Sequence, residues 1–230
     1  SNMERGNYLN YLVEQGFDVI NFDYNNYNIK KYNPSRFLNE ISDSDILDSI
    51  RFKVIVLQMV ERTFVSNIIK AETASILSFK ELQNQINQKN RNDSKHFFDV
   101  KSYTNDLILF YRYGFFYNFN DRAFDSPVYK FTLNKQLFSE NENQLLCFNN
   151  DINFLSYVND ESMKLVEKTL ATIREKLLKK GVQLIVLPAP DKYDLYYSFI
   201  EENRHEANPF FEFLNQFKNS EYIINTKQLL

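Results

Sequence analysis

The stretch VIVLQMVERTF, residues 54–64, decides the fold that we expect for this chain. Its first part is an apolar run rich in β-branched residues, which is typical of a strand buried on both faces of a parallel sheet. No turn residue ends the run, because it passes directly into Glu61 and Arg62. We therefore expect a core strand over residues 53–59 that surfaces at two charged side chains.

Segments on both sides of this stretch predict further strands. Each is apolar, rich in β-branched or aromatic residues, and bounded by turn residues. They are FDVINFDY at 17–24, VQLIVLPAP at 182–190 and EYIIN at 221–225. We expect Pro188 and Pro190 to end the second of these strands, because proline cannot donate to a sheet ladder.

Helical patterns lie between the expected strands. Short helices are expected within residues 7–15, 34–50, 191–203, 208–217 and 226–230. The most regular pattern lies at 159–180, where Asn159 or Asp160 is expected to cap the helix and Gly181 to end it. The side chains expected on its apolar face are Leu165, Thr169, Ile173 and Leu177.

The alternation of strands and helices predicts βαβ units, with a parallel sheet and right-handed crossovers. In such sheets, functional residues gather at the carboxyl ends of the strands. The residues expected at those ends are Asp23, Tyr24, Asn25, Glu61, Arg62, Pro188, Ala189, Pro190, Asp191, Lys192 and Asn225. Glu61 and Arg62 are therefore expected at the rim that usually holds a site.

Residues 64–158 have a less regular pattern. We expect a mostly helical and aromatic insertion there, within a single α/β domain that covers residues 1–230. Aromatic residues are dense between Tyr103 and Phe119. The segments SPVYKFTL at 126–133 and QLLCFNND at 144–151 have the composition of extended chain.

The composition excludes several classes of function. The 27 basic residues are interspersed among 30 acidic ones, so we expect no basic surface for nucleic acid. With 4 glycines the chain has no glycine-rich phosphate loop, and we expect no cofactor. Cys147 is the single cysteine and has no metal-ligating neighbours in sequence, so we expect no intramolecular disulfide and no metal site. No apolar run approaches the roughly 18 residues of a transmembrane segment, and the first 30 residues lack a secretory signal.

Two interpretations stay open for the charged rim residues. Glu61 and Arg62 either pair with neighbours and start the next helix, or Arg62 binds a carboxylate or orients a loop. Asp191 either caps the following helix or points into the site together with Lys192, and the two roles are compatible.

The aromatic and histidine residues add neither a nucleophile nor a clear base. Tyr193, Tyr196 and Tyr197 are expected to lie partly in the core and partly at the rim, where sugar-binding and packing aromatics have the same sequence pattern. His96 and His205 are expected to be solvated loop residues rather than catalytic bases. No serine stands in a GxSxG elbow, and neither an HExxH motif nor paired carboxylates are present. The sequence predicts a site without a nucleophile.

Three stretches together resemble a known family. They are NYLNYLVEQGFDVINFD at 7–23, VIVLQMVERTF at 54–64 and GVQLIVLPAPDKYDLYY at 181–197. In that order they are similar to segments of the SGNH-hydrolase-like proteins related to the alginate O-acetyltransferases AlgX and AlgJ, also called DHHW-type proteins. The marks of the resemblance are Val60-Glu61-Arg62 after one strand and the P-x-P-x-K pattern of Pro188, Pro190 and Lys192 after another. The similarity covers residues 1–63 and 160–230.

The resemblance implies a flavodoxin-like three-layer α/β/α fold with a parallel sheet. It also implies a Ser-His-Asp site that moves acetyl groups on or off polysaccharide hydroxyls outside the cytoplasm. The family's serine lies in a G-D-S block and its acid and base in a D-x-H-W block, and this chain contains neither block. The serine is expected just before Ser1 and the acid and base after Leu230, so the fold is expected to be incomplete at both ends. Asn25 or Asn26 is a candidate oxyanion donor.

Two main hypotheses for function follow. In the first, the chain is part of an extracytoplasmic SGNH-like carbohydrate O-acetyltransferase or esterase that acts on a polysaccharide or other acetylated glycan, with a membrane-bound acetyl donor as a possible partner. Arg62 and Lys192 then organise the site or contact an acidic glycan. In the second, the chain is a non-catalytic carbohydrate-binding or polysaccharide-assembly module, which an exposed aromatic patch within residues 111–117 favours. A cytoplasmic α/β protein of unrelated function is a third alternative.

Overall fold

The structure is a computed structural model that describes residues 8–19, 33–50, 52–70, 128–139 and 143–230, with isolated positions between residues 80 and 115. The expected strand at 17–24 lies mostly outside these ranges: residues 17–19 are described and form no strand, and residues 20–24 are not described. The expected site residues Asn25 and Asn26 lie outside them too, as does His96.

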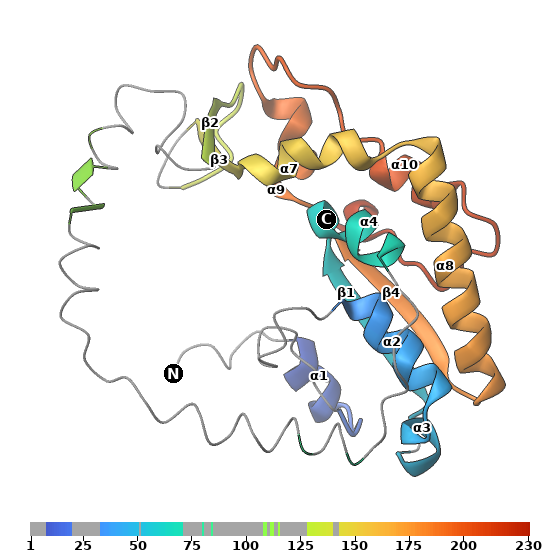
Figure 1. The fold of residues 1–230 in the computed structure, drawn as a ribbon. Helices are drawn as coiled ribbons and strands as arrows, with labels where there is room; N and C mark the ends of the chain where they lie inside the picture. Colours follow the sequence, from blue (N-terminus) through green and yellow to red (C-terminus); the bar gives the residue numbers. More distant parts are fainter. Residues whose placement is uncertain are drawn as a thin grey trace.

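A parallel pair of strands lies at the centre of the described part of the chain (Figure 1). Strand β1 (Val54–Val60) pairs with β4 (Gln183–Ala189) in a register that runs from Val54 opposite Gln183 to Val60 opposite Ala189. Both strands and their parallel pairing were expected from the sequence and are confirmed. Helix α4 (Glu61–Ile69) begins at the residue that follows β1, so strand and helix join without a loop.

The expectation that Pro188 ends its strand is wrong. Pro188 lies inside β4 and is paired with Met59 of β1. Alternate residues of a strand direct their N–H groups to the same side, and the N–H of Val186 donates to the carbonyl of Tyr222, away from β1. The missing N–H of Pro188 is therefore on the side away from β1, where the only partner of β4 among the described residues is the segment around Ile223, and the β1 ladder loses no donor.

The expected strand at 221–225 is reduced to a single parallel bridge between Val186 and Ile223. Two backbone hydrogen bonds hold this bridge, from Val186 N–H to the Tyr222 carbonyl at 2.8 Å and from Ile224 N–H to the Val186 carbonyl at 2.9 Å. The chain then enters a 3-10 turn, η4 (Thr226–Leu229), rather than the expected α-helix. Asn225 caps this turn, because its side chain accepts from the N–H of Gln228.

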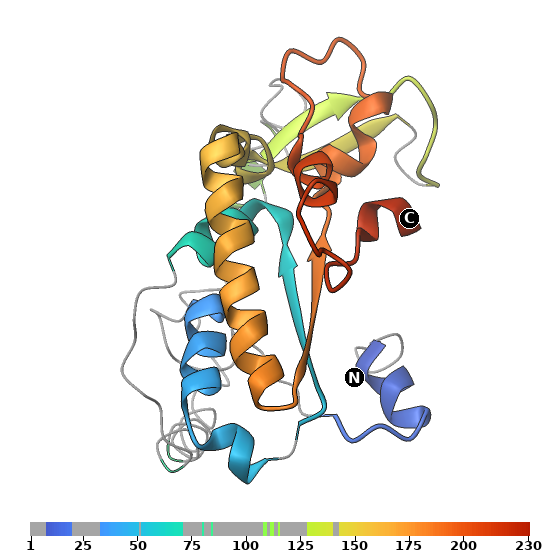
Figure 2. The ribbon, with the colours of Figure 1, turned by 90° about the vertical axis from the view of Figure 1, so that its right-hand side faces the viewer.

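Helices cover one face of the strand pair (Figure 2). The longest is α8 (Asp160–Lys179), and Asn159 caps it by accepting from the N–H of Ser162 at 3.0 Å. This helix was expected with these ends and is confirmed. Helix α2 (Pro34–Asp43) lies beside it, and the short α3 (Ile46–Ser49) follows α2.

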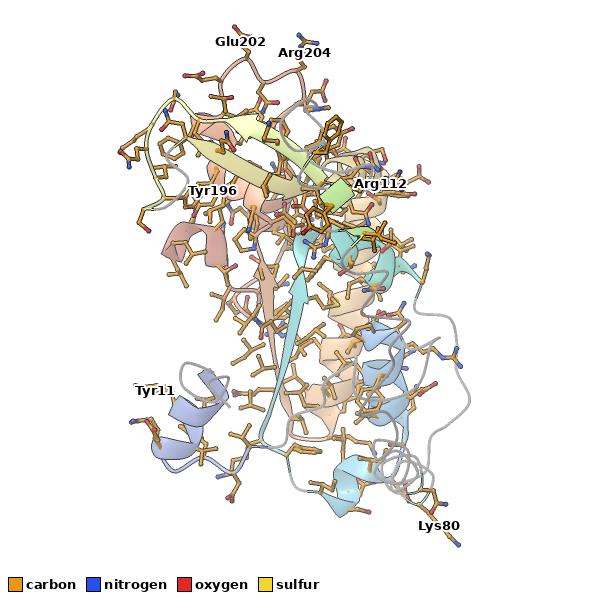
Figure 3. All side chains as sticks on the ribbon, turned by 90° about the vertical axis from the view of Figure 1, so that its left-hand side faces the viewer. Tyr11, Lys80, Arg112, Tyr196, Glu202 and Arg204 are labelled. Carbon is orange, nitrogen blue, oxygen red and sulfur yellow. The ribbon has the colours of Figure 1, made fainter. Side chains whose placement is uncertain are left out.

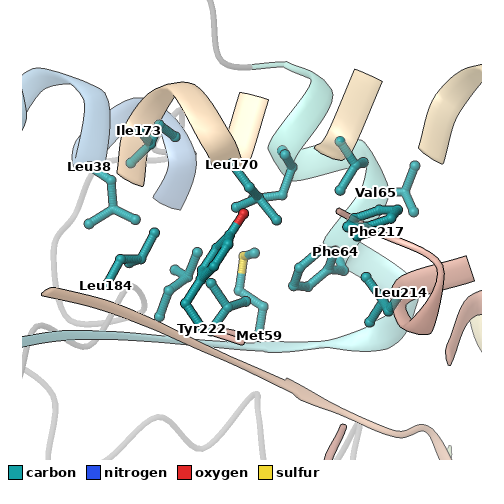
Figure 4. Close-up of a cluster of buried hydrophobic side chains, with 14 of the residues drawn as sticks. Leu38, Met59, Phe64, Val65, Leu170, Ile173, Leu184, Leu214, Phe217 and Tyr222 are labelled. Carbon is teal, nitrogen blue, oxygen red and sulfur yellow. The ribbon is translucent and has the colours of Figure 1, made fainter. Parts of the chain in front are cut away.

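The main core lies between these helices and the sheet (Figure 4). Its members on α8 are Met163, Val166, Leu170, Ile173 and Leu177. The expected apolar face of α8 is thus half right: Ile173 and Leu177 are buried, whereas Leu165 is 43% exposed. Phe64, Ile68 and Phe154, which belong to the expected insertion, are also members of the main core.

A second, smaller core lies above the carboxyl end of β4. Strands β2 (Val128–Thr132) and β3 (Gln144–Phe148) form an antiparallel hairpin, so the expected extended segments are confirmed over these residues, whereas the end of the second, residues 149–151, is helical. Short helices α7 (Asn149–Asn153) and η2 (Phe154–Tyr157) lead from β3 toward α8. The buried side chains of this hairpin core are Leu133, Leu145, Cys147, Ile152, Tyr193 and Ile200.

The expected helix at 191–203 is shorter than its pattern predicts. Helix α9 (Lys192–Tyr196) and the 3-10 turn η3 (Tyr197–Phe199) replace it, because Ile200 leaves the helical path to form an antiparallel bridge with Leu133 of the hairpin. Helix α10 (Phe210–Asn215) also starts later than expected, although the Asn208 side chain still accepts from the N–H of Phe210 at 3.0 Å.

The other face of the strand pair carries no packed helix in the ranges that the structure describes. Val54, Val56 and Val60 of β1 are 42%, 40% and 37% exposed on that face. Helix α1 (Tyr8–Glu14), ended as expected at Gly16 with a φ of +85°, lies on this side of the sheet (Figures 1 and 2). The side chains of Tyr11 and Val13 on this helix are exposed. The described chain is therefore a mixed α/β structure with one packed helical layer, and the three-layer arrangement is not shown.

Among the described residues, no helix is both long enough and apolar enough to cross a bilayer.

Candidate functional site

The carboxyl ends of β1 and β4 lie side by side, which brings together residues that are 130 positions apart in sequence. Val60 pairs with Ala189, so Glu61 and Arg62 follow one strand end while Pro190 and Asp191 follow the other. The residues expected at these two strand ends thus lie close together in the fold.

Reciprocal hydrogen bonds tie these two strand ends together. The carboxyl of Glu61 accepts from the N–H of Asp191 at 2.9 Å, and the carboxylate of Asp191 accepts from the N–H of Arg62 at 2.8 Å. Glu61 is fully buried and Asp191 is 5% exposed. The first N–H groups of a helix have no partner within it, so Asp191 satisfies one such donor of α4 from the neighbouring strand. Each acidic side chain thereby fixes the backbone that follows the other strand.

Arg62 does not pair with Glu61, although the two are adjacent in sequence. Its Nη1 donates to the carboxylate of Asp191 and, at 3.0 Å, to that of Asp151 on α7. Asp151 also accepts from the N–H of Phe148 at 3.3 Å, and the guanidinium carbon lies 5.6 Å from the centre of the Phe148 ring. Arg62 therefore connects the main core, where α4 packs, to the end of the hairpin.

The guanidinium of Arg62 keeps part of its donor capacity open. The side chain is 31% exposed, and no described residue accepts from Nε or Nη2. A guanidinium presents its five donors in a fixed plane. Two buried carboxylates therefore orient this plane while its remaining donors are available to another molecule or to a part of the chain that the structure does not describe.

The buried side chain of Glu61 is a protonated carboxyl group. Burial, followed by the charge of Asp194, raises the pKa of Glu61 from about 4.5 to about 9, against the lowering effect of the Asp191 N–H. The second carboxyl oxygen accepts from the side-chain amide of Asn208, whose orientation is fixed by its bond to Phe210. At neutral pH this carboxyl therefore carries a proton, and Glu61 supports the rim without adding a charge.

The two aspartates around Arg62 also have raised pKa values. Burial and the charge of Asp151 raise the pKa of Asp191 to about 6, with the charge of Arg62 acting in the opposite direction. Burial raises the pKa of Asp151 as well, and Arg62 again opposes it. When both carboxylates are ionised, the single guanidinium between them leaves the cluster with one net negative charge.

A second anchor lies at the carboxyl end of β4. The Thr226 hydroxyl donates to the carbonyl of Pro188, and Lys227 Nζ donates to the carboxylate of Asp194 at 2.8 Å. The other carboxylate oxygen of Asp194 is buried and has no partner among the described residues. Burial raises the pKa of Asp194, against the effect of Lys227. The turn η4 is thus fastened to the same rim as Glu61.

The structure gives the other expected site residues different surroundings. Lys192 is exposed at the start of α9, Pro188 is buried in β4 and Pro190 is half-buried. Tyr196 is half-buried, with its ring 5.4 Å from that of Phe138 (Figure 3). Asp191 occupies the N-cap position of α9 but makes no side-chain cap there, because its carboxylate is directed to Arg62.

Sequence reasoning missed three contributors to the rim: Asp151, Asp194 and Lys227. It interpreted a fourth, Asn208, only as a helix cap. Their contacts join positions far apart in the chain, such as the pair of Arg62 and Asp151, which are 89 positions apart. No local pattern marks such a pair, so only the position of Asn208 before Pro209 gave any signal.

The described residues provide no nucleophile and base pair. Cys147 is fully buried, and burial raises the pKa of its thiol to about 12, which leaves it unreactive. His205 is half-buried among aromatic rings rather than solvated, with its ring centre 5.7 Å from that of Tyr129 and 6.4 Å from that of Tyr193. No cluster of metal-ligating side chains occurs in the described part of the chain. The rim can position and bind, but it contains no residue that could start an acyl transfer.

A scan against protein-family models, a search of curated proteins and a search of solved structures each found no match to this chain.

Proposed function

We propose that this chain is the central part of an SGNH-hydrolase-like carbohydrate O-acetyltransferase or esterase that acts outside the cytoplasm. The observation that carries the proposal is the rim built from Glu61, Arg62 and Asp191, where reciprocal hydrogen bonds tie the ends of two parallel strands together. Such strand ends are where α/β folds place their sites. The rim is pre-organised, because the buried carboxylates of Asp151 and Asp191 hold the guanidinium of Arg62 in place.

The proposed chemistry is acyl transfer through a serine that lies outside this chain. A histidine would take the proton of the serine hydroxyl as its oxygen attacks the acetyl carbonyl, and backbone amides would hold the oxyanion. As this intermediate collapses, the bond from the acetyl carbon to the donor's leaving group would break, and the histidine would give its proton to that group. A glycan hydroxyl or water would then attack the acyl-serine and lose its proton to the histidine, which would return it to the departing serine oxygen. In this scheme the role of the described residues is to bind and orient the glycan.

Arg62 is the residue that we assign to the glycan. Its Nε and Nη2, which have no acceptor among the described residues, suit a carboxylate of an acidic sugar, because a guanidinium binds carboxylates through two parallel hydrogen bonds. Lys192, exposed next to Asp191, adds a second positive charge near the same strand ends. The polysaccharide substrate is thus proposed to be acidic, and the acetyl donor a membrane-bound partner.

The flavodoxin-like three-layer fold belongs to the same proposal. The parallel pairing of β1 with β4 and the helices on one face of the pair support it. The exposed apolar face of the pair supports it further, since parallel sheets are normally covered on both faces.

A non-catalytic carbohydrate-binding or assembly module is the second candidate. Tyr111 and Phe115 favour it, because their side chains are 74% and 65% exposed. Exposed aromatic rings can stack on sugar rings. The other members of the expected aromatic patch, Tyr113, Phe116 and Tyr117, lie outside the described residues.

Reading the gene on both sides of this segment separates the two candidates. The transferase requires a G-D-S block upstream and a D-x-H block downstream, whereas a binding module requires neither. Absence of both blocks would contradict the first proposal. If they are present, replacing the G-D-S serine by alanine should abolish acetyl-ester turnover by the full-length protein.

The role of Arg62 can be tested with two substrates. In the full-length protein, we expect Arg62→Lys to lower kcat/KM for an acetylated acidic glycan about tenfold, a loss of roughly 1.4 kcal/mol, while turnover of a small neutral acetyl ester stays unchanged. Arg174→Lys is the matched control, since Arg174 pairs with the exposed Glu221 away from the rim. Equal losses on both substrates would show that Arg62 only supports the fold.

A further inference from the structure

Two buried carboxyl groups lie next to each other at the start of α9. Asp191 is the N-cap residue of this helix, so Asp194 holds the third helical position, and in a capping box the side chain there reaches back to the N-cap N–H. Glu61 has taken that N–H instead, at 2.9 Å. The carboxyl groups of Glu61 and Asp194 therefore converge on the same end of α9, and after burial the charge of Asp194 has the largest effect on the pKa of Glu61.

The surroundings of Glu61 favour its neutral form. Its side chain is fully buried, and the nearby cations are directed elsewhere: the guanidinium of Arg62 donates to two aspartates, and Lys227 donates to Asp194. Burial of an ionised carboxyl without a paired cation is costly, so the group keeps its proton. A neutral carboxyl has an O–H group to donate.

The O–H group of Glu61 requires an acceptor. The two hydrogen bonds that Glu61 makes with described residues come from the Asp191 N–H and from the side-chain amide of Asn208, and both use its oxygens as acceptors. Neither bond uses the acidic hydrogen. A buried donor that is left unpaired destabilises the fold, so an acceptor is required close to Glu61.

Asp194 supplies a matching acceptor. It is 4% exposed, and one of its carboxylate oxygens accepts from Lys227 Nζ at 2.8 Å. The other oxygen is buried and has no partner among the described residues. Burial raises the pKa of Asp194, but the bond and the charge of Lys227 lower it. Because Lys227 pairs with Asp194 rather than with Glu61, Asp194 is the group that ionises and accepts.

We propose that Glu61 and Asp194 share one proton, with the O–H of Glu61 hydrogen-bonded to the free oxygen of Asp194 directly or through one buried water. Either path joins Asn208, Glu61, Asp194 and Lys227 into one network. The proton thereby fastens the C-terminal turn η4 to the ends of the two strands. The pairing is independent of acyl transfer.

Loss of this proton weakens the hold on η4. Glu61 then becomes a buried carboxylate that faces Asp191 and Asp194, with Lys227 as the opposing charge. Glu212 on α10 adds a further negative charge near Asp194. Like charges in a buried site repel each other, and outward movement of Asp194 carries Lys227 and η4 with it. The docking of η4 therefore depends on the proton.

Infrared spectroscopy of protein with 13C-labelled glutamate side chains tests the shared proton. At pH 7 we expect the band of a protonated glutamate carboxyl, which Glu61→Gln should remove. Asp194→Asn should shift this band to higher frequency, because a neutral acceptor binds the O–H more weakly than a carboxylate does. Asp48→Asn, which changes a 69% exposed carboxylate on α3, should leave the band in place.

Lys227→Gln is a second variant with the opposite expectation. Lys227 is 30% exposed, and without its charge Asp194 becomes a stronger acceptor, so the band should move to lower frequency. Absence of a Glu61 band at pH 7, or the same frequency in the wild type and both variants, would overturn the proposal.

Hydrogen–deuterium exchange tests the link to η4. Glutamine keeps an N–H donor at position 61, whereas methionine is unbranched and has none. At pH 7 we expect the η4 amides to exchange about fivefold faster in Glu61→Met than in Glu61→Gln, roughly the effect of one net hydrogen bond. The amides of α4 are the reference, since general loosening of the rim would release them as well. Equal rates in the two variants, or an increase that α4 shares, would show that the proton does not hold η4.

Discussion

At the scale of single residues, the buried acid Glu61 makes the stability of the protein depend on pH. Its pKa rises from about 4.5 in the unfolded chain to about 9 in the fold. The folded state therefore holds a proton that the unfolded state has lost, and the contribution to stability is complete below pH 4.5 and gone above pH 9. Between pH 6 and 9, where the Asp191 pKa of about 6 has little further effect, we expect the free energy of unfolding to fall by up to about 1.4 kcal/mol per pH unit.

Urea unfolding of Glu61→Gln across this pH range tests the prediction. The variant should have a flatter pH profile than the wild type, whatever its absolute stability, because the glutamine does not titrate. Glu201→Gln, which changes an exposed carboxyl, should keep the wild-type slope. Parallel profiles for the wild type and Glu61→Gln would contradict a raised pKa.

Some features of the rim could be predicted from the sequence and others could not. Glu61, Arg62 and Asp191 could be predicted, because each directly follows an apolar strand and the ends of parallel strands meet at one edge. The residues that hydrogen-bond to these three side chains could not be predicted from the sequence. Asp151 reaches Arg62 from α7, and Asn208 reaches Glu61 from 147 positions away, so neither contact leaves a periodic signal.

At the scale of elements, α8 carries much of the main core, and its buried face is the feature to test. We expect Leu170→Ala to lower the free energy of unfolding by about 2–5 kcal/mol, because Leu170 is fully buried and alanine leaves a cavity. Leu165→Ala, on the same helix but 43% exposed, should cost less than about 1 kcal/mol. Urea denaturation measures both, and similar losses would contradict the observed rotation of the helix.

The ends of α8 were predictable, whereas its face was only partly so. Caps are local chemistry: Asn159 accepts from an N–H three residues later, and Gly181 adopts a φ of +74°. The face predicted from Leu165 and every fourth residue after it drifts by about 40° at each step around the helix. The buried face instead alternates steps of three and four residues from Met163 to Leu177, which keeps it in line with the sheet.

At the scale of the whole molecule, the parallel pair could be derived from the sequence, but the position of the hairpin could not. Strands β1 and β4 are apolar enough to be recognised alone. The hairpin core depends on contacts such as the bridge from Leu133 to Ile200, which joins segments separated by α8 and β4. The sequence pattern predicts that these segments are extended, but it does not predict what they pack against.

The ion pair of Arg62 with Asp151 joins the main core to the hairpin core, and its removal should let the hairpin open first. Asp151 is 3% and Asp191 5% exposed, so Arg62→Gln leaves two buried carboxylates without the guanidinium and should cost about 3 kcal/mol. In hydrogen–deuterium exchange, we expect the amides of β3 to exchange faster in this variant by a larger factor than those of α8. Arg174→Gln breaks the exposed pair with Glu221, whose carboxylate is 66% exposed, and should cost less than about 1 kcal/mol without this difference. If β3 and α8 accelerated by the same factor in Arg62→Gln, the two cores would unfold as one unit and the coupling role of Arg62 would be wrong.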